Sequence, residues 1–168
     1  YVTTAVLRVH SDQQAGLGES VLAGAVSRWS WLVGAVATAV LGGAVLMFFA
    51  GLGNGLGAGL TMGEPQTVMR LTLAGLSYVP ALAVMAAVAA LAVALRRPWI
   101  AWLAVTFVIT ALYLGALLRL PQWLIDLSPV GQTTVPTDVP VGALVVMVAV
   151  AALITLLAGS VYRRRDAA

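Results

Sequence analysis

The sequence contains no cysteine and no lysine, and its single histidine is His10. Without cysteine the chain has no disulfide, no thiolate metal site and no cysteine nucleophile. A P-loop needs a lysine after its glycines, so the chain cannot bind and hydrolyse ATP in that way by itself. One histidine cannot supply a multi-histidine metal site. These absences predict a chain without an enzyme active site, a metal centre or a cofactor.

Charge is also scarce. Only 9% of the 168 residues are charged, whereas a soluble domain carries roughly 25%. The hydrophobic fraction is 61% and the mean hydropathy is +1.01. A soluble domain of this size needs a polar shell that this composition cannot supply, so we expect an all-α integral membrane protein or part of one. The formal charge of +3 comes from arginine, and in a membrane chain it predicts orientation rather than nucleic-acid binding.

Four long stretches without charge each exceed the roughly 18 residues that indicate a membrane-spanning helix. They predict transmembrane helices at residues 31–60, 71–95, 99–118 and 141–162, with an external loop at residues 61–70. The first would be about 45 Å long against a hydrocarbon core of roughly 30 Å, so it must tilt, kink or project into water. In the second, Pro80 is expected to kink the helix.

The arginines predict which way the chain faces. With four spans, Arg70 and Arg119 fall on one side of the membrane and the other seven arginines on the opposite side. By the positive-inside rule, this is a multi-pass protein of the plasma membrane with both termini in the cytoplasm. Residues 1–30 would form a cytoplasmic segment and residues 31–168 a transmembrane domain. Tyr1 in place of Met indicates a fragment or a processed product, and no cleavable signal peptide is visible.

A short amphipathic helix is expected in the cytoplasmic segment. Ser11 and Gln14 have the spacing of a capping box, which predicts that a helix starts there. Leu17 and Val21 follow at four-residue spacing, and Glu19 is available to water. The pattern is typical of a helix that lies along the membrane surface.

A second short helix is expected on the outer side, within residues 119–140. The run from Pro121 to Pro129 is bounded by proline at both ends, which suits the first turn and the end of a re-entrant or interfacial helix. Trp123 and Asp126 belong to this external element. Asp126 could bind a cation, but a solvated carboxylate is the favoured interpretation in such a loop.

The first span ends in a run rich in glycine. Gly51, Gly55 and Gly59 are four residues apart and share one helix face, along which another helix can approach closely. Phosphate binding would need a strand–turn–helix context that this run lacks. Asn54 is the candidate for a residue that faces a transport pathway, although a hydrogen bond within or between helices is the favoured role for polar residues in the spans.

The central parts of the four stretches contain no Asp, Glu, Lys, Arg or His. Ion-coupled transporters and proton pumps usually carry such a residue as the coupling site, so an ion-coupled carrier is disfavoured. If the chain takes part in transport, we expect the energy to come from elsewhere, such as a partner ATPase.

Two motifs and the order of elements suggest a family. The segment Glu-Ser-Val-Leu-Ala-Gly-Ala-Val-Ser-Arg at residues 19–28 is similar to the E-P-V-L-A-T-P-V-S-R segment of actinobacterial exporters of polyketide antibiotics, the tetronasin type. The external run at residues 121–129 resembles their P-x-W-x-x-x-L-S-P element. Surface helix, spans and external helix follow one another as in the back part of a permease of type-two ABC exporters. Ser20 and Ala25 depart from the pattern, because proline is usual at both positions.

The resemblance implies that the chain is a C-terminal fragment of a membrane-spanning permease. Such a permease is part of an ATP-driven exporter of hydrophobic compounds such as polyketide antibiotics or drugs. Its partners would be a separate ATP-binding subunit, the rest of the permease or a second permease half, and the lipid bilayer. The resemblance further implies an ATPase-coupling interface at Asp12, Gln14, Glu19, Val21, Leu22, Ser27 and Arg28. The alternative is a non-transporting membrane-assembly or scaffold subunit, which the glycine face and the uncharged spans suit equally.

Overall fold

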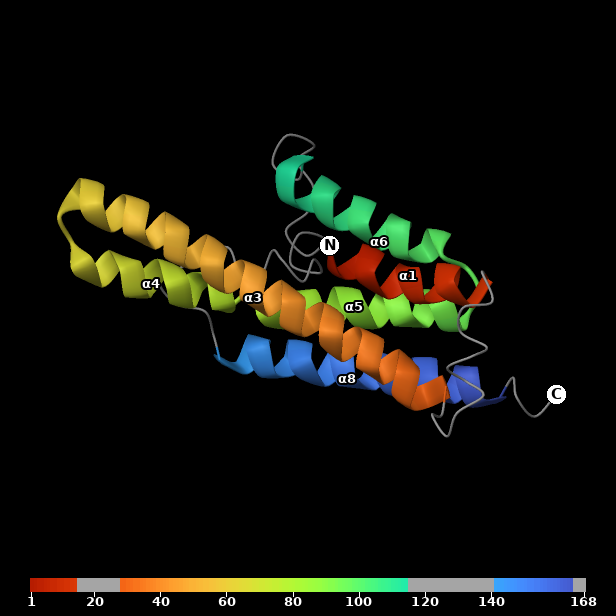
Figure 1. The fold of residues 1–168 in the computed structure, drawn as a ribbon. Coiled ribbons are helices and arrows are strands. Elements are labelled where there is room, and N and C mark those ends of the chain that lie inside the picture. Colours follow the sequence, from red (N-terminus) through yellow and green to blue (C-terminus); the bar gives the residue numbers. More distant parts are fainter. Residues whose placement is uncertain (15–27, 115–140, 165–168) are drawn as a thin grey trace.

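The structure is a computed structural model that describes residues 1–14, 28–114 and 141–164 (Figure 1). The regular elements of these residues are all helical, which confirms the all-α class for this part of the chain. They are α1 (Val2–Gln14), α3 (Arg28–Met62), α4 (Pro65–Leu76), α5 (Val79–Ala94), α6 (Trp99–Ile109), the π-helical turn η1 (Thr110–Leu114) and α8 (Val141–Arg164).

Helix α5 lies in the middle of the bundle, where it contacts α1, α3, α6 and α8 (Figure 1). Its buried residues are mostly alanines and occur all around the helix: Ala81, Val84, Ala86, Ala87, Ala89, Ala90, Ala92, Val93 and Ala94. Small side chains let neighbouring helices approach closely, which is the usual basis of helix association in membranes. The alanine content of α5 therefore explains why four elements can pack around it.

Three helical segments are long and apolar enough to cross a membrane: Trp29–Met62, Pro65–Ala94 and Gly142–Val161. They correspond to the first, second and fourth predicted spans. The third prediction, at residues 99–118, is covered by α6 and η1 only up to residue 114, and its last residues lie outside the described part. The structure thus supports a polytopic membrane protein, while the number of four spans stays a prediction.

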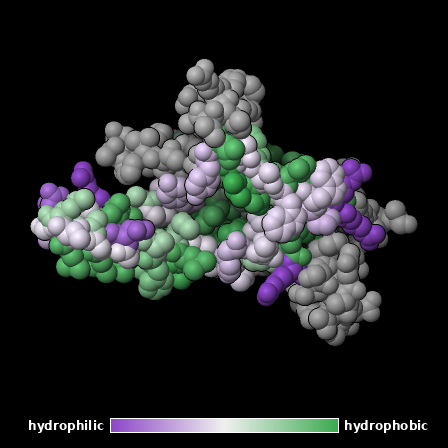
Figure 2. Space-filling model, turned by 90° about the horizontal axis from the view of Figure 1, so that it is seen from above, coloured by the Kyte–Doolittle hydropathy of each residue, from purple (hydrophilic) through white to green (hydrophobic). Residues whose placement is uncertain are grey.

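The outer surface of the bundle is strongly apolar. Leu41, Phe49, Val146 and Leu156 are each more than 60% exposed. Figure 2 shows hydrophilic residues gathered toward the two ends of the elongated molecule, with hydrophobic and neutral surface between them. In water this surface would be unstable, whereas in a bilayer it faces lipid or other membrane helices.

Pro80 interrupts the second span, as predicted. Helix α4 ends at Leu76, and Pro80 lies in the first turn of α5. Because proline has no N–H, it cannot donate to the carbonyl four residues earlier. Local groups close the break instead: the Ser77 hydroxyl donates to the Ala74 carbonyl oxygen at 2.7 Å, and the Tyr78 N–H donates to Gly75 O at 3.2 Å.

Residues 61–70 form a tight helical hairpin in place of the predicted loop, and their external location stays a prediction. Helix α3 continues to Met62 and α4 begins at Pro65. Gly63 between them has φ +69°, a left-handed conformation that glycine adopts without strain. The Glu64 N–H donates to Gly59 O at 3.2 Å and so closes the end of α3. Proline suits the first turn of a helix, which is why α4 starts at once.

The predicted helix start at Ser11 is also wrong. Helix α1 begins at Val2 and passes through Ser11 before it ends at Gln14. Val2 and Val6 lie one helical turn apart and are buried in the main apolar cluster of the bundle, so packing fixes the helix well ahead of Ser11. The rest of the predicted surface helix, residues 15–27, lies outside the described residues.

Candidate functional site

The α3–α4 hairpin projects past the ends of α5, α6 and α8 (Figure 1). With 35 residues, α3 is roughly 52 Å long, well above the hydrocarbon thickness of about 30 Å. The sequence predicted that this stretch would tilt, kink or project at its glycine-rich end. The structure shows one continuous helix whose far end is held by α4, so projection of the hairpin is the outcome it favours.

Glycines hold the hairpin together. A Cβ atom on Gly51 would lie 2.8 Å from Leu71 O, and one on Gly55 would lie 2.8 Å from Val68 O. A Cβ atom on Gly59 would lie 2.9 Å from the Val68 side chain. Two of these three contacts are with backbone atoms of α4, which cannot move aside as a side chain can. The predicted packing face thus lies against α4.

Asn54 lies on α3 within the same run, between Gly51 and Gly55, and its side chain is exposed. It is therefore outside the contact with α4. Its assignment to a transport pathway stays a prediction. Other polar residues in the helices bond to their own backbone, as predicted: the Thr38 and Thr155 hydroxyls donate to the carbonyls four residues earlier, at 2.8 and 2.7 Å.

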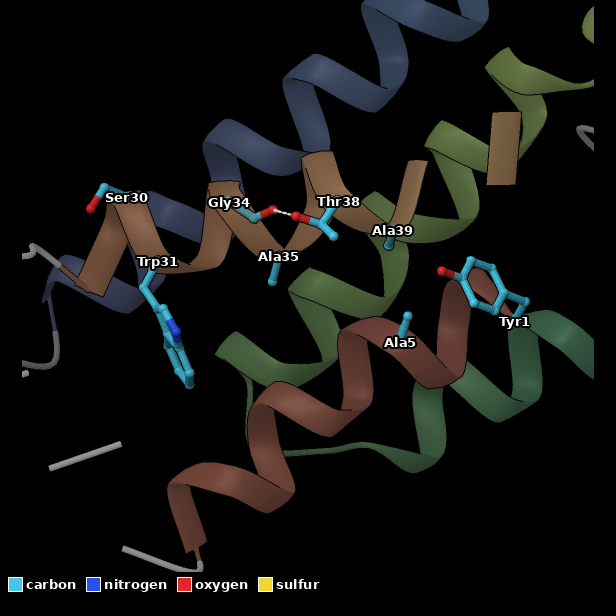
Figure 3. Close-up of a pocket in the computed structure, with 8 residues that line it drawn as sticks. All are labelled: Tyr1, Ala5, Ser30, Trp31, Gly34, Ala35, Thr38 and Ala39. Carbon is cyan, nitrogen blue, oxygen red and sulfur yellow. Dashed lines mark hydrogen bonds between the residues drawn. The ribbon is translucent and has the colours of Figure 1, made fainter. Parts of the chain in front are cut away.

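A groove of about 460 Å³ opens between α1 and α3 (Figure 3). Helix α1 contributes Tyr1 and Ala5, and the first third of α3 contributes Ser30, Trp31, Gly34, Ala35, Thr38 and Ala39. In Figure 3 the Trp31 indole and the Tyr1 ring lie at opposite ends of the groove, and Ala5 points from α1 toward α3. The small residues between the two rings leave the space open.

The chemistry of the groove is neutral. None of its eight lining residues carries a charge. The Thr38 hydroxyl donates to Gly34 O at 2.8 Å and keeps its oxygen lone pairs as acceptors. The Trp31 indole N–H is a donor, and the Tyr1 hydroxyl both donates and accepts. The volume falls within the range of roughly 300–1,000 Å³ typical of small-molecule sites.

At the end of the bundle where α3 begins, α3 and α8 meet through a tryptophan and a glycine. The Trp29 ring fills the position that a Cβ atom on Gly159 would occupy. Trp29 directly follows Arg28, the last residue of the predicted coupling interface. A movement of the chain around Arg28 would therefore act on α8 through this contact.

The turn between α5 and α6 carries two further arginines. Arg97 N–H donates to Ala92 O at 2.9 Å, and Arg96 N–H donates to Val93 O at 3.0 Å. This is the Schellman pattern, and Arg96 takes the left-handed position with φ 55°. Both guanidinium groups are exposed. This turn lies between the predicted spans at residues 71–95 and 99–118.

Only some of the other predicted site residues lie in the part of the chain that the structure describes. Asp12 and Gln14 lie in the last turns of α1, and Arg28 starts α3. Outside the described residues lie Glu19, Val21, Leu22, Ser27, Trp123, Asp126 and Pro129. Within the described residues, no cluster of three or more His, Asp or Glu side chains could hold a metal ion.

Sequence reasoning did not find the groove. Trp31, Gly34 and Thr38 all fall within the first predicted span, at residues 31–60. A weak signal was present, since Gly34, Ala35, Thr38 and Ala39 place small residues on consecutive turns of α3. The pairing of this face with α1, which joins residues far apart in the chain, is visible only in the structure.

Comparison with known proteins covers nearly the whole chain. A family model described as "Multidrug efflux system permease Rv1217c, C-terminal domain" matches residues 1–163. The multidrug efflux system permease protein Rv1217c of Mycobacterium tuberculosis (strain ATCC 25618 / H37Rv) is 31% identical over 174 aligned residues. The alignment covers 99% of this chain and 31% of that protein, so the chain spans about a third of the curated relative that it matches.

Proposed function

The chain belongs to the family of C-terminal domains of the multidrug efflux system permease Rv1217c, and on that premise we propose that it is the C-terminal, membrane-spanning part of an efflux permease. The family match over residues 1–163 is the observation that carries the proposal. The apolar helices support it, because three of them are long enough to cross a bilayer. The rest of the permease, or a second permease half, would complete the transporter.

The energy for export comes in this proposal from a separate ATP-binding subunit. Two features support that source: the chain has no P-loop lysine, and Trp29–Met62 and Gly142–Val161 contain no ionisable side chain. The exported compounds are hydrophobic. Polyketide antibiotics are the class suggested by the motifs at residues 19–28 and 121–129.

Orientation follows from the arginines. Both termini are placed in the cytoplasm of a plasma-membrane protein, because most arginines then lie on the cytoplasmic side. The ATPase would contact the segment from Asp12 to Arg28. Its movement would tilt α3, which begins at Arg28 and is one unbroken helix, and the binding region would open alternately to the two sides.

Replacing Leu22 with Asp, or Arg28 with Glu, in the full permease is expected to lower efflux by about tenfold or more while ATP hydrolysis continues. The few residues that dominate an interface, near its centre, cost about 2 kcal/mol or more when they are truncated, and about 1.4 kcal/mol is tenfold. Efflux from loaded cells and ATPase activity of the purified complex measure the two quantities. Gln66→Ala, at the far tip of the hairpin, is the control. Wild-type efflux in both interface variants would count against this coupling role.

A pull-down tests the transport function itself. The intact permease that contains this segment is purified in mild detergent, and its companions are identified by mass spectrometry. We expect a nucleotide-binding subunit in stoichiometric amount. Recovery of other membrane proteins without such a subunit would instead favour the scaffold function, for which the glycine-packed hairpin is equally suited.

A further inference from the structure

The groove between α1 and α3 has a polar group at each end and an apolar middle. Trp31 lies at one end and Tyr1 at the other, and Thr38 lies on the α3 wall toward Tyr1 (Figure 3). From Trp31 to Thr38 the helix rises by about 10 Å. Between them the walls are formed by Ala5 and by the small residues of α3. The groove therefore has a defined length as well as a defined polarity.

The lining distinguishes between kinds of ligand. A charged ligand would need a countercharge, and none of the eight lining residues supplies one. A lipid acyl chain would offer no hydrogen-bond partner to the Trp31 indole N–H or to the Tyr1 hydroxyl at the two ends, which costs free energy in an apolar setting. A neutral molecule with polar atoms at its two ends satisfies both conditions. Aromatic rings at the ends further favour a rigid, flat body.

We propose that this groove is a binding site for a neutral, rigid and mostly apolar molecule about 10 Å long that carries hydrogen-bonding groups at both ends. The molecule reaches the groove sideways from the membrane. Trp31 donates its indole N–H to one end of the ligand, and Thr38 and Tyr1 bond the other end. The site rests on the proposed function for its biological role, since it is then where an exported compound is first held.

Photolabelling of the full-length permease in lipid nanodiscs tests the site. The probe is dimethoxybenzophenone, a rigid neutral ketone with an oxygen at each end that is itself photoreactive. We expect saturable labelling that maps to residues 1–5 and 30–39. Labelling that spreads evenly over exposed residues such as Phe49 and Val146 would overturn the proposal.

A filling substitution sharpens the test. A Cβ atom on Gly34 meets nothing within 4 Å, so Gly34→Leu fills the groove without a clash and should lower labelling by about tenfold or more. Gly53 lies on the same helix, away from the groove, with equal space around it. Gly53→Leu should therefore leave labelling unchanged. Equal labelling in the two variants contradicts the proposal.

A second variant tests the site without adding a large side chain to α3, so its result does not depend on whether Gly34→Leu folds. Thr38→Val preserves the shape and removes the hydroxyl, so labelling should fall by about threefold to tenfold. A photoreactive phosphatidylcholine, with the reactive group on its acyl chain, is the parallel arm. If this lipid labels the groove and the ketone does not, the groove is a lipid site and the proposal is overturned. The assay needs no ATP and no partner, so its result is separate from the pull-down.

Discussion

Replacing Gly55 with leucine is expected to destabilise the α3–α4 hairpin strongly. A Cβ atom at this position would lie 2.8 Å from the carbonyl oxygen and 2.9 Å from the Cα atom of Val68. Because these are backbone atoms, the helices must separate to make room. Overpacking costs about 1–3 kcal/mol where neighbours can adjust, and we expect the upper end or more here, which lowers the melting temperature in detergent by roughly 6–12 °C.

The same glycine-rich run supplies the control. Gly53 and Gly57 alternate with the packing glycines, and a Cβ atom on either meets nothing within 4 Å. Gly53→Leu and Gly57→Leu should therefore melt at or above the wild-type temperature, since leucine favours a helix more than glycine does. Equal destabilisation by Gly53→Leu and Gly55→Leu would show that the run matters for its flexibility and not for contact with α4.

The glycine periodicity illustrates what the sequence could predict. The four-residue spacing of Gly51, Gly55 and Gly59 defines a helix face that another helix can approach, whatever the partner. It could not name the partner. The first half of α4, before residue 71, was missed because Glu64, Gln66 and Arg70 have the polarity of an exposed loop. These residues are polar because they lie at the tip of the hairpin. The helical conformation of α4 follows from the glycine turn before it and the proline in its first turn, which hydropathy does not report.

The sequence also could not predict how helices far apart in the chain pack together. The apolar stretches gave the ends of α3 and α8 to within about two or three residues, because a bilayer demands one long run of apolar residues from each span. The break before Pro80 followed from the missing N–H. The groove could not be found in this way, since it arises from the distance between α1 and α3. That distance depends on how Val2 and Val6 pack in the core of the bundle.

Replacing Gly159 with leucine is expected to disconnect α3 from α8 at the end where α3 begins. The Trp29 ring already occupies the space into which the new side chain would grow. The ring must leave, and Arg28 is the neighbouring residue at the start of α3. If Arg28 belongs to the ATPase interface, as proposed, efflux per folded permease should fall by about tenfold or more while ATP hydrolysis continues. Efflux and ATPase assays, normalised to the amount of monodisperse protein, measure this.

Two further variants separate coupling from simple loss of stability. Gly142, at the other end of the same helix, has nothing within 4 Å of its Cβ position, so Gly142→Leu should leave efflux and ATP hydrolysis unchanged. Combining Gly159→Leu with Trp29→Ala removes the clash, and efflux should partly recover, because substitutions at residues in contact are not additive. If Gly159→Leu lowers only the amount of folded protein and leaves efflux per molecule intact, the contact is structural. A loss of efflux per molecule that Trp29→Ala relieves would instead mean that α8 moves with the start of α3 during transport.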